Sequence, residues 1–551
     1  NLDLSFGRYD KTQNMLGLPF VVLKANNQDP SALREWIAMK LFRAMGIPAP
    51  REAPAQLYVN GQYLGFYFIV EHVDSAFLKR VLGESGGYLY KWTRSELFYN
   101  FENLGSDPNL YAQFLELKSD QASPDLQTFA DLVQVINRPS APDFTDQDFI
   151  RALSKYINPR QFLYYCAIEE ALGNLDSLAG GIVGVNNLYL YQFQNTTRYY
   201  LFPWDLDMTF SVGDRDILMG ISGGPNINLL MKRLFAIPEY AQVYLDALVQ
   251  AGTVMGGADG WADRAIVREY NLIRDAATND PHKQCFVSGA LQPCGAGDFE
   301  VDSQWLRTFL AERAGYIAAE AGKLGYIAPK TRPVVDNVYT VDGGKALSPG
   351  ALANVDGSGL SPIEAGAYGV PLPRVLVNDA SYVSIDGVRA PLILASDGNV
   401  RLQVPPDIAP GTSSLVLFNE GLPSLATAIP IQAATPVIVA VTHSDGSSVT
   451  LSKPPVSGET VAIYATGLGA VNMNLDPGAA APLDAVVLTA ELPVLRLEDL
   501  AMQVTFSGMV PGYIALYQVN ALVPSLPRSK LYSGCTLTIA GQTAEWQYPS
   551  F

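Results

Sequence analysis

The sequence predicts a multidomain α+β protein in which a mixed helical and stranded region precedes an all-β region. The first observation is length, because 551 residues are too many for one ordinary domain. The second is helical periodicity, which dominates residues 124–327 after a stranded start. The third is a change at 328–333, where helical patterning ends and alternating strands with turn residues follow. We therefore expect a first domain over 1–327.

A weak internal repeat divides the all-β region. Residues 399–405 (NVRLQVP) parallel 517–524 (YQVNALVP), and each run reads as a strand that ends in Val-Pro. Two β-sandwich units of about 100 residues each, near the usual immunoglobulin-like size, fit this repeat. We expect these units over 334–433 and 434–551.

The charge balance restricts the classes of partner. The chain has 54 Asp and Glu against 37 Lys and Arg, a formal net charge of −17. Such a protein repels the phosphates of nucleic acid and an anionic membrane surface. The most apolar stretch, 428–441, is interrupted by Pro430 and Pro436 and is shorter than the ~20 apolar residues that a spanning helix needs. We expect no nucleic-acid partner and no membrane span.

Cysteine spacing indicates the compartment. Cys285 and Cys294 lie close together in a loop rich in Gly, Pro and Ser, which predicts a local disulfide and a secreted or cell-surface location. A zinc site at this loop would use nearby His282, but a fourth ligand is missing. Cys166 and Cys535 lie in apolar runs, so we expect buried thiols there.

The first elements form a short α+β pattern. Strand-like runs at 2–6 and 18–23 precede a helix over 32–45, and Ser31 is the expected N-cap of that helix. Two further strands, at 57–59 and 63–70, are joined by an Asn-Gly turn at 60–61, which is typical of a β-hairpin.

Amphipathic periodicity and capping residues predict the helices that follow. Thr145 or Asp146 opens one helix, and Asn158 opens the next. The other segments with helical spacing are 124–136, 161–172, 226–235, 241–251, 260–277 and 302–324.

A polar hairpin in the first domain carries the candidate site. Runs at 187–191 and 198–202 read as strands joined by the polar residues 194–197. Antiparallel pairing would gather oxygen-bearing side chains at one end of the hairpin: Asp176, Asn186 or Asn187, Asp205 and Asp207. These are hard ligands that suit Mg²⁺. The alternative is an ordinary turn at 203–207 that an Asp side chain caps.

These motifs resemble the CotH kinase family of spore-coat proteins. The resemblance lies in Asp176 followed by 187–191 (NLYLY) and 203–207 (PWDLD). A second block agrees in order and spacing: 29–31 (DPS), 33–35 (LRE), 46–51 (GIPAPR), 58–63 (YVNGQY) and 65–71 (GFYFIVE). Family members are atypical protein kinases that use Mg-ATP, so the resemblance implies a bilobal kinase-like fold with an N-lobe over about 1–75 and a C-lobe over 76–327.

The resemblance also implies residue roles. Asp176 would accept the proton of the attacking hydroxyl, while Asp205 and Asn187 (or Asn186) would hold Mg²⁺ with help from Asp207. The gap of 187 − 176 = 11 residues between Asp176 and Asn187 is longer than in ordinary kinases, because a Gly-rich insertion at 179–184 lengthens it.

Three further residues are candidates for contact with ATP. Lys24 and Glu35 would be the nucleotide lysine and its helix partner, with a solvated strand end as the alternative for Lys24. Glu71 would bind the adenine or ribose edge, or pair with a nearby Arg. We expect a truncated N-terminus, in which case a Lys upstream of residue 1 would be the phosphate contact. The sequence has no G-x-G-x-x-G loop.

The functional expectation is therefore a secreted kinase that phosphorylates Ser or Thr hydroxyls of an unidentified protein substrate. One alternative is an extracellular structural or adhesive protein whose kinase-like domain is a non-catalytic scaffold. Another is an adhesin in which Asp205 and Asp207 bind Ca²⁺. Residues 465–469 and 506–520 resemble a C-terminal β-domain of large secreted proteins of soil bacteria. The immunoglobulin-like units would then serve self-association or surface-structure partners.

Overall fold

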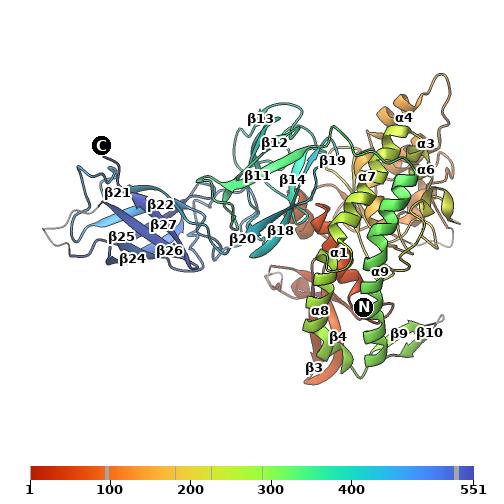
Figure 1. Cartoon of the computed structure of the whole chain (residues 1–551), viewed down its shortest axis with the longest axis horizontal. Coiled ribbons are helices and arrows are strands. Elements are labelled where there is room, and N and C mark those ends of the chain that lie inside the picture. Colours follow the sequence, from red (N-terminus) through yellow and green to blue (C-terminus); the bar gives the residue numbers. More distant parts are fainter. Residues whose placement is uncertain are drawn as a thin grey trace. The chain divides into compact units, whose positions relative to one another are not determined.

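The computed structural model describes the chain except residues 1, 11, 16, 94–97, 180, 225, 288, 289, 526–532 and 551. Two compact units are present, Asn1–Thr331 and Arg332–Phe551. The first mixes helices and sheets and the second is all-β (Figure 1), which confirms the predicted change of fold class along the chain. No helix in the described part of the chain combines the length and apolar character that crossing a bilayer requires.

The first sheet has the strand order β1-β2-β4-β3, and all its pairs are antiparallel. Its strands are β1 (Leu2–Ser5), β2 (Phe20–Lys24), β3 (Glu52–Val59) and β4 (Gln62–Glu71). The turn between β3 and β4 is the predicted Asn-Gly turn. Asn60 and Gly61 have φ values of 53° and 80°, a left-handed pair that Asn and Gly adopt at little cost.

Helix α1 (Arg34–Ala44) connects β2 to β3 and begins two residues later than predicted. Ser31 is not its N-cap, because Ala32 adopts a φ of 55° that breaks the helical path. The Ser31 hydroxyl instead donates to Asp29 at 2.5 Å, and Asp29 accepts from the backbone N–H of Arg34 at 2.8 Å. The carboxylate of Asp29, and not the hydroxyl of Ser31, therefore accepts the hydrogen bond from the first N–H group of α1.

The second sheet has the order β6-β5-β7-β8 and contains the predicted hairpin. Its strands are β5 (Tyr88–Trp92), β6 (Leu115–Leu117), β7 (Leu188–Gln192) and β8 (Tyr199–Pro203). β7 and β8 pair antiparallel and every residue in them is buried. Both strands therefore belong to the core, and only their ends reach the site.

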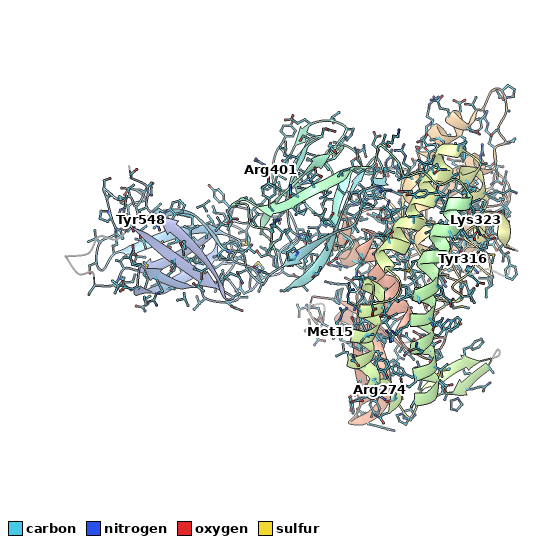
Figure 2. The ribbon with its side chains drawn as sticks, viewed as in Figure 1. Met15, Arg274, Tyr316, Lys323, Arg401 and Tyr548 are labelled. Carbon is cyan, nitrogen blue, oxygen red and sulfur yellow. A yellow bond between two sulfur atoms is a disulfide. The ribbon has the colours of Figure 1, made fainter. Side chains whose placement is uncertain are left out.

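Helices fill the rest of the first unit: α2 (Ser75–Leu82), α3 (Leu126–Asn137), α4 (Asp146–Leu153), α5 (Pro159–Ala171), α6 (Leu229–Phe235), α7 (Pro238–Met255), α8 (Trp261–Thr278) and α9 (Ala296–Lys323). Short helical turns lie at η1 (Phe6–Arg8), η2 (Pro108–Phe114) and η3 (Met219–Gly223). Thr145 and Asn158 are N-caps, as predicted. In Figure 2, Arg274 marks α8, and Tyr316 and Lys323 mark α9. α9 packs against both α7 and α8.

The loop between α8 and α9 is a short hairpin of β9 (Gln284–Val287) and β10 (Ala290–Pro293). Cys285 and Cys294 close it with the predicted disulfide, and their Cα atoms are 5.6 Å apart. Residues 288 and 289 of this loop lie outside the described residues. Cys166 and Cys535 are buried free thiols, as expected.

The second unit contains only strands among its described regular elements. One sheet has the order β11-β12-β17-β16-β13, and another has β15-β14-β18-β19 with β20 also paired to β18. These strands are β11 (Val334–Thr340), β12 (Leu352–Ser358), β13 (Ala365–Gly366), β14 (Tyr382–Ile385), β15 (Val388–Arg389), β16 (Leu392–Ala395), β17 (Asn399–Gln403), β18 (Gly411–Asn419), β19 (Leu422–Pro423) and β20 (Thr427–Ile431).

The remaining strands form one seven-stranded sheet, β21-β22-β25-β24-β23-β26-β27. They are β21 (Val437–Thr442), β22 (Thr460–Thr466), β23 (Val494–Leu497), β24 (Leu500–Met509), β25 (Tyr517–Leu522), β26 (Gly534–Ile539) and β27 (Gln542–Gln547). β24 pairs with β23 through residues 500–502 and with β25 through residues 503–509, so it joins the two groups of strands into one sheet. The assignment of immunoglobulin-like units to 334–433 and 434–551 stays a prediction.

Candidate active site

Lys24 is the last residue of β2, and it is buried. Its side chain is only 3% exposed, and its Nζ lies 2.7 Å from Glu35 Oε1 and 2.8 Å from Asp205 Oδ1. The alternative of a solvated strand end for Lys24 is therefore wrong. One ammonium group joins strand β2, helix α1 and the loop after β8, which are separated by up to 181 residues in the sequence.

The charges of this trio depend on one another. Burial acts to lower the pKa of Lys24, but the carboxylates of Glu35 and Asp205 outweigh it and raise that pKa above its ordinary value. Burial also acts to raise the pKa of Asp205, yet Lys24 brings it below its ordinary value. Burial dominates at Glu35 and raises its pKa. The arrangement thus keeps a lysinium and an aspartate side by side.

Asp205 occupies a strained turn directly after β8. Its φ is 54°, a left-handed value that is uncommon for non-glycine residues, although Asp adopts it more readily than most. The preceding residue, Trp204, is fixed by a hydrogen bond from its N–H to the carbonyl of Asn187 at 3.2 Å. Its ring lies 4.6 Å from Lys24 Nζ and 5.4 Å from Lys91 Nζ. The end of the hairpin therefore presents Asp205 to the cationic groups.

Asp176 lies on the loop that follows α5. Gly173 has a φ of 61°, and a Cβ there would come within 3.0 Å of the Ser211 hydroxyl. The Asn174 side chain accepts from the N–H of Asp176 at 3.1 Å. A backbone bond from Leu175 to the carbonyl of Met208, 3.1 Å long, ties this loop to the segment after β8. The two loops are thus held together by main-chain contacts.

The structure brings Asp176 together with both candidate asparagines. Asn186 donates its side-chain amide to the two carboxylate oxygens of Asp176, at 2.9 and 3.1 Å. Asn187, with a φ of 57°, donates its amide to the backbone carbonyl of Asp176 at 3.1 Å. The long insertion between them therefore folds back, so that sequence distance does not separate the groups. Gly180 of this insertion lies outside the described residues.

Asp207 completes the set of acidic groups. It makes no side-chain hydrogen bond or ion pair within the described part of the chain, and burial followed by the charge of Asp205 raises its pKa well above the ordinary value. Across the described residues, no group of three or more His, Cys, Asp or Glu side chains could hold a metal ion alone. Mg²⁺ needs only one or two carboxylates when phosphate oxygens and water complete its shell. Asp205 with Asn187 or Asn186, beside an unpaired Asp207, fits that requirement.

Glu71 lies apart from these residues. In the pairing of β2 with β4, Glu71 is opposite Val21 whereas Lys24 is opposite Phe68, a separation of about 10 Å along the strand. Its carboxylate oxygens lie 3.2 Å from Arg51 and 2.7 Å from Arg80. The structure therefore shows the ion pair that the sequence left open as the alternative for Glu71.

Sequence reasoning gave no role to Arg34, although the motif 33–35 contains it. Its guanidinium donates to the carbonyl of Thr209 at 2.6 Å and to Asp302 of α9 at 3.0 Å. It thus connects the helix that carries Glu35 to the segment just beyond Asp207. The only available signal was its position beside Glu35, because its partners lie 175 and 268 residues away.

The family model described as CotH kinase protein matches residues 1–317. A curated relative, the inner spore coat protein H of Bacillus subtilis (strain 168), is 23% identical over 270 residues, which cover 48% of this chain and 70% of the relative.

Two solved structures show only slight similarity. SGBP-B from a xyloglucan utilization locus of Bacteroides uniformis has a TM-score of 0.13 and 16% identity, and covers 39% of this chain. The γ-CGTase of alkalophilic Bacillus clarkii has a TM-score of 0.15 and 12% identity, and covers 41% of this chain. The matches span 49% and 27% of those two proteins and carry no argument about fold. The family match extends over more than half of the sequence and includes every candidate site residue discussed above, so the chain belongs to the CotH kinase family.

Proposed function

We propose that the protein is a secreted atypical protein kinase that transfers the γ-phosphate of Mg-ATP to Ser or Thr hydroxyls of a protein substrate. Family membership suggests kinase activity. The observation that carries the proposal is the buried Lys24, which contacts Glu35 and Asp205 at once. Protein kinases require a strand lysine paired with a helix glutamate and a nearby metal-binding aspartate, and this trio has those components.

The remaining roles come from the family resemblance, and the contacts of these residues support them. Asp176 is the proposed base, and the amide of Asn186 holds its carboxylate in one orientation. Asp205 and Asn187 or Asn186, assisted by Asp207, are the proposed ligands of Mg²⁺. When bound, Mg²⁺ would supply positive charge that neutralises the phosphate oxygens during transfer. Lys24 would bind a phosphate oxygen while Glu35 keeps its ammonium group in place.

The secreted location is supported by the disulfide Cys285–Cys294, since such bonds persist in oxidising compartments. It is also compatible with the all-β second unit, whose role we propose to be attachment to surface structures or self-association. Nothing in this second role requires catalysis.

Calorimetric titration of the full chain with ATP in the presence of Mg²⁺ tests the function. We expect saturable binding that is lost without Mg²⁺ and in Asp205→Ala. A matched control is Asp214→Ala, which removes an exposed carboxylate from the same segment and should leave binding unchanged. Absence of ATP binding by the wild-type chain would contradict the proposal and favour a non-catalytic scaffold.

A further inference from the structure

We infer that Arg313 of α9 is a positioning residue for phosphoryl transfer, because its guanidinium holds the loop that carries Asp176 against the segment that follows Asp207. This inference rests on the proposed function, and it concerns a residue to which the sequence motifs gave no role. Three observations carry it: the burial of Arg313, the groups that its side chain binds, and the contacts between the two segments.

Arg313 occupies a core position of α9. It belongs to a buried stripe whose members are three or four residues apart, the spacing of one helix face: Leu306, Leu310, Arg313 and Ile317. The other three side chains are apolar, whereas the arginine is 0% exposed. The ring of Tyr316, labelled on the same helix in Figure 2, lies 5.7 Å from its guanidinium. A charged side chain is almost never fully buried without polar partners, so this position requires a specific set of acceptors.

The guanidinium of Arg313 binds the main chain of two segments. Its Nε donates to the carbonyl of Ala171 at 3.2 Å, and its Nη2 donates to the carbonyl of Glu170 at 2.6 Å. Its Nη1 donates to the carbonyls of Gly213, at 3.2 Å, and of Arg215. The first two carbonyls belong to the last turn of α5, where a helix leaves carbonyl groups without regular partners. The other two lie in the segment after β8.

The charge of Arg313 is compensated at the same place. Its guanidinium lies 3.5 Å from the carboxylate of Glu170, which also accepts from Arg215 Nε at 3.0 Å. All three side chains are buried, and we call them the Arg313 clamp. The clamp joins α9, α5 and the segment after β8 through charges that water does not screen.

Hydrogen bonds lead from this clamp to the proposed site. The N–H of Phe210 donates to the carbonyl of Leu172 at 2.7 Å, and the Ser211 hydroxyl donates to the carbonyl of Gly173 at 2.6 Å. Leu175, the residue before the proposed base, donates its N–H to the same downstream segment at 3.1 Å. The two loops are thus joined along their length, and the Arg313 clamp closes the end of this series opposite the base.

This set of contacts needs an arginine. A guanidinium has five N–H donors in a fixed plane, whereas an ammonium group offers three donors from one point. Arg313→Lys would keep a positive charge beside Glu170 but could not reach both pairs of carbonyls. We therefore expect it to loosen the loop that carries Asp176. The ion pairs of Lys24 should stay intact, because they join β2, α1 and the first residues after β8.

The experiment measures transfer of the labelled γ-phosphate of Mg-ATP by the full chain to random peptides that contain one fixed Ser or Thr. Arg313→Lys is compared with Arg307→Lys, the same substitution at an exposed position of α9 that pairs with Asp263. We expect Arg313→Lys to lower kcat by about 10- to 100-fold and to change the Kd of Mg-ATP by less than about twofold. Arg307→Lys should change neither quantity by more than about twofold.

Hydrogen exchange, followed by mass spectrometry, separates a positioning role from a loss of overall stability. In Arg313→Lys, the amides of residues 172–176 and 208–215 should exchange at least about tenfold faster, while those of β7 and β8 keep the wild-type rate. A variant that is only less stable would accelerate the slow amides of all elements together.

A second variant keeps the test decisive if Arg313→Lys does not fold. Ser211→Ala removes the bond to the carbonyl of Gly173 and leaves the Arg313 clamp in place. We expect transfer to be slower by about fivefold, with the affinity for Mg-ATP unchanged. A wild-type rate in Ser211→Ala overturns the inference.

The outcomes separate this inference from the proposed function. Unchanged transfer by Arg313→Lys, or unchanged exchange in the two segments, overturns the inference while the kinase proposal stands. Faster exchange throughout the first unit shows a role in stability alone and also overturns it. A wild type that binds no Mg-ATP, or that transfers phosphate to no peptide, overturns the proposed function and this inference with it.

Discussion

At the scale of single residues, the most informative group is the ammonium group of Lys24 on β2, because it pairs with carboxylates from α1 and from the loop after β8. Glu35 is 1% exposed and its carboxylate has Lys24 as its cationic partner. Removal of one member of a buried pair leaves the other charge uncompensated, which costs more than the loss of the attraction itself.

We therefore expect Lys24→Met to lower the free energy of unfolding of the first unit by about 3 kcal/mol, measured by urea titration. The double variant Lys24→Met with Glu35→Met should recover part of this loss, because it removes both buried charges. A single variant as stable as the wild type would show that the pair is not buried in solution. Both variants should lose ATP binding.

Glu71 provides a prediction about pH. Burial acts to raise the pKa of Glu71, but Arg80 and then Arg51 bring it below the ordinary value of 4.5. A group with a lowered pKa in the folded state stabilises the fold above its unfolded pKa and loses that effect as the pH falls through its folded pKa. We expect Glu71→Gln to be less stable than the wild type near neutral pH and the difference to shrink below a pH of about 4.5. Thermal melting over this pH range measures it, and a difference independent of pH would contradict it.

The same residues explain how far the sequence could predict the site. Asp176, the asparagines and Asp205 were found because a hairpin is a local pattern, and its strands are adjacent in the chain. For Lys24 the sequence left open a pair with Glu35 and a solvated strand end, because its burial depends on Asp205, 181 residues away. The sequence left Glu71 open between the nucleotide and an Arg pair, because its partners Arg51 and Arg80 lie outside β4 and the alternation of apolar residues gives no information about such pairing.

At the scale of elements, α5 is the helix that leads into Asp176. Its N-cap Asn158 accepts hydrogen bonds from Arg160 and Gln161 at 3.0 and 3.1 Å. Asn158→Ala should destabilise the first unit by about 1 kcal/mol, whereas Asn158→Asp retains an acceptor and should be nearly neutral. Urea unfolding measures both variants, and equal losses would show that the cap is not the cause.

The helix N-caps are the features that the sequence predicted best, because the capping side chain and the backbone N–H groups that it accepts from lie within four residues of one another. Thr145 and Asn158 follow this rule. Ser31 breaks it, since Asp29 accepts the backbone N–H of Arg34 at the start of α1, and the Ser31 hydroxyl donates to the carboxylate of Asp29. The seven-stranded sheet of the second unit was harder to predict, because pairing of β23 with β26 joins residues about forty positions apart.

At the scale of the whole chain, two compact units predict two unfolding transitions. Differential scanning calorimetry should resolve the two transitions. Mg-ATP should raise the midpoint temperature of only one of them, because a ligand stabilises the unit that binds it. That transition should be the one lost from a fragment that begins at Arg332. A single transition that shifts as a whole with Mg-ATP would show that the units unfold together.

The disulfide hairpin has a consequence for how the protein is prepared. Phe286 of this hairpin donates its backbone N–H to Asn27, and the Lys283 ammonium next to it donates to the carbonyls of Ala25, Asn26 and Asp29. These contacts fix the chain immediately after Lys24. A chain produced in a reducing cytosol, or assayed with dithiothreitol, lacks the covalent bond that holds the hairpin. Such material should bind ATP more weakly than protein exported to an oxidising compartment, and reoxidation should restore the affinity.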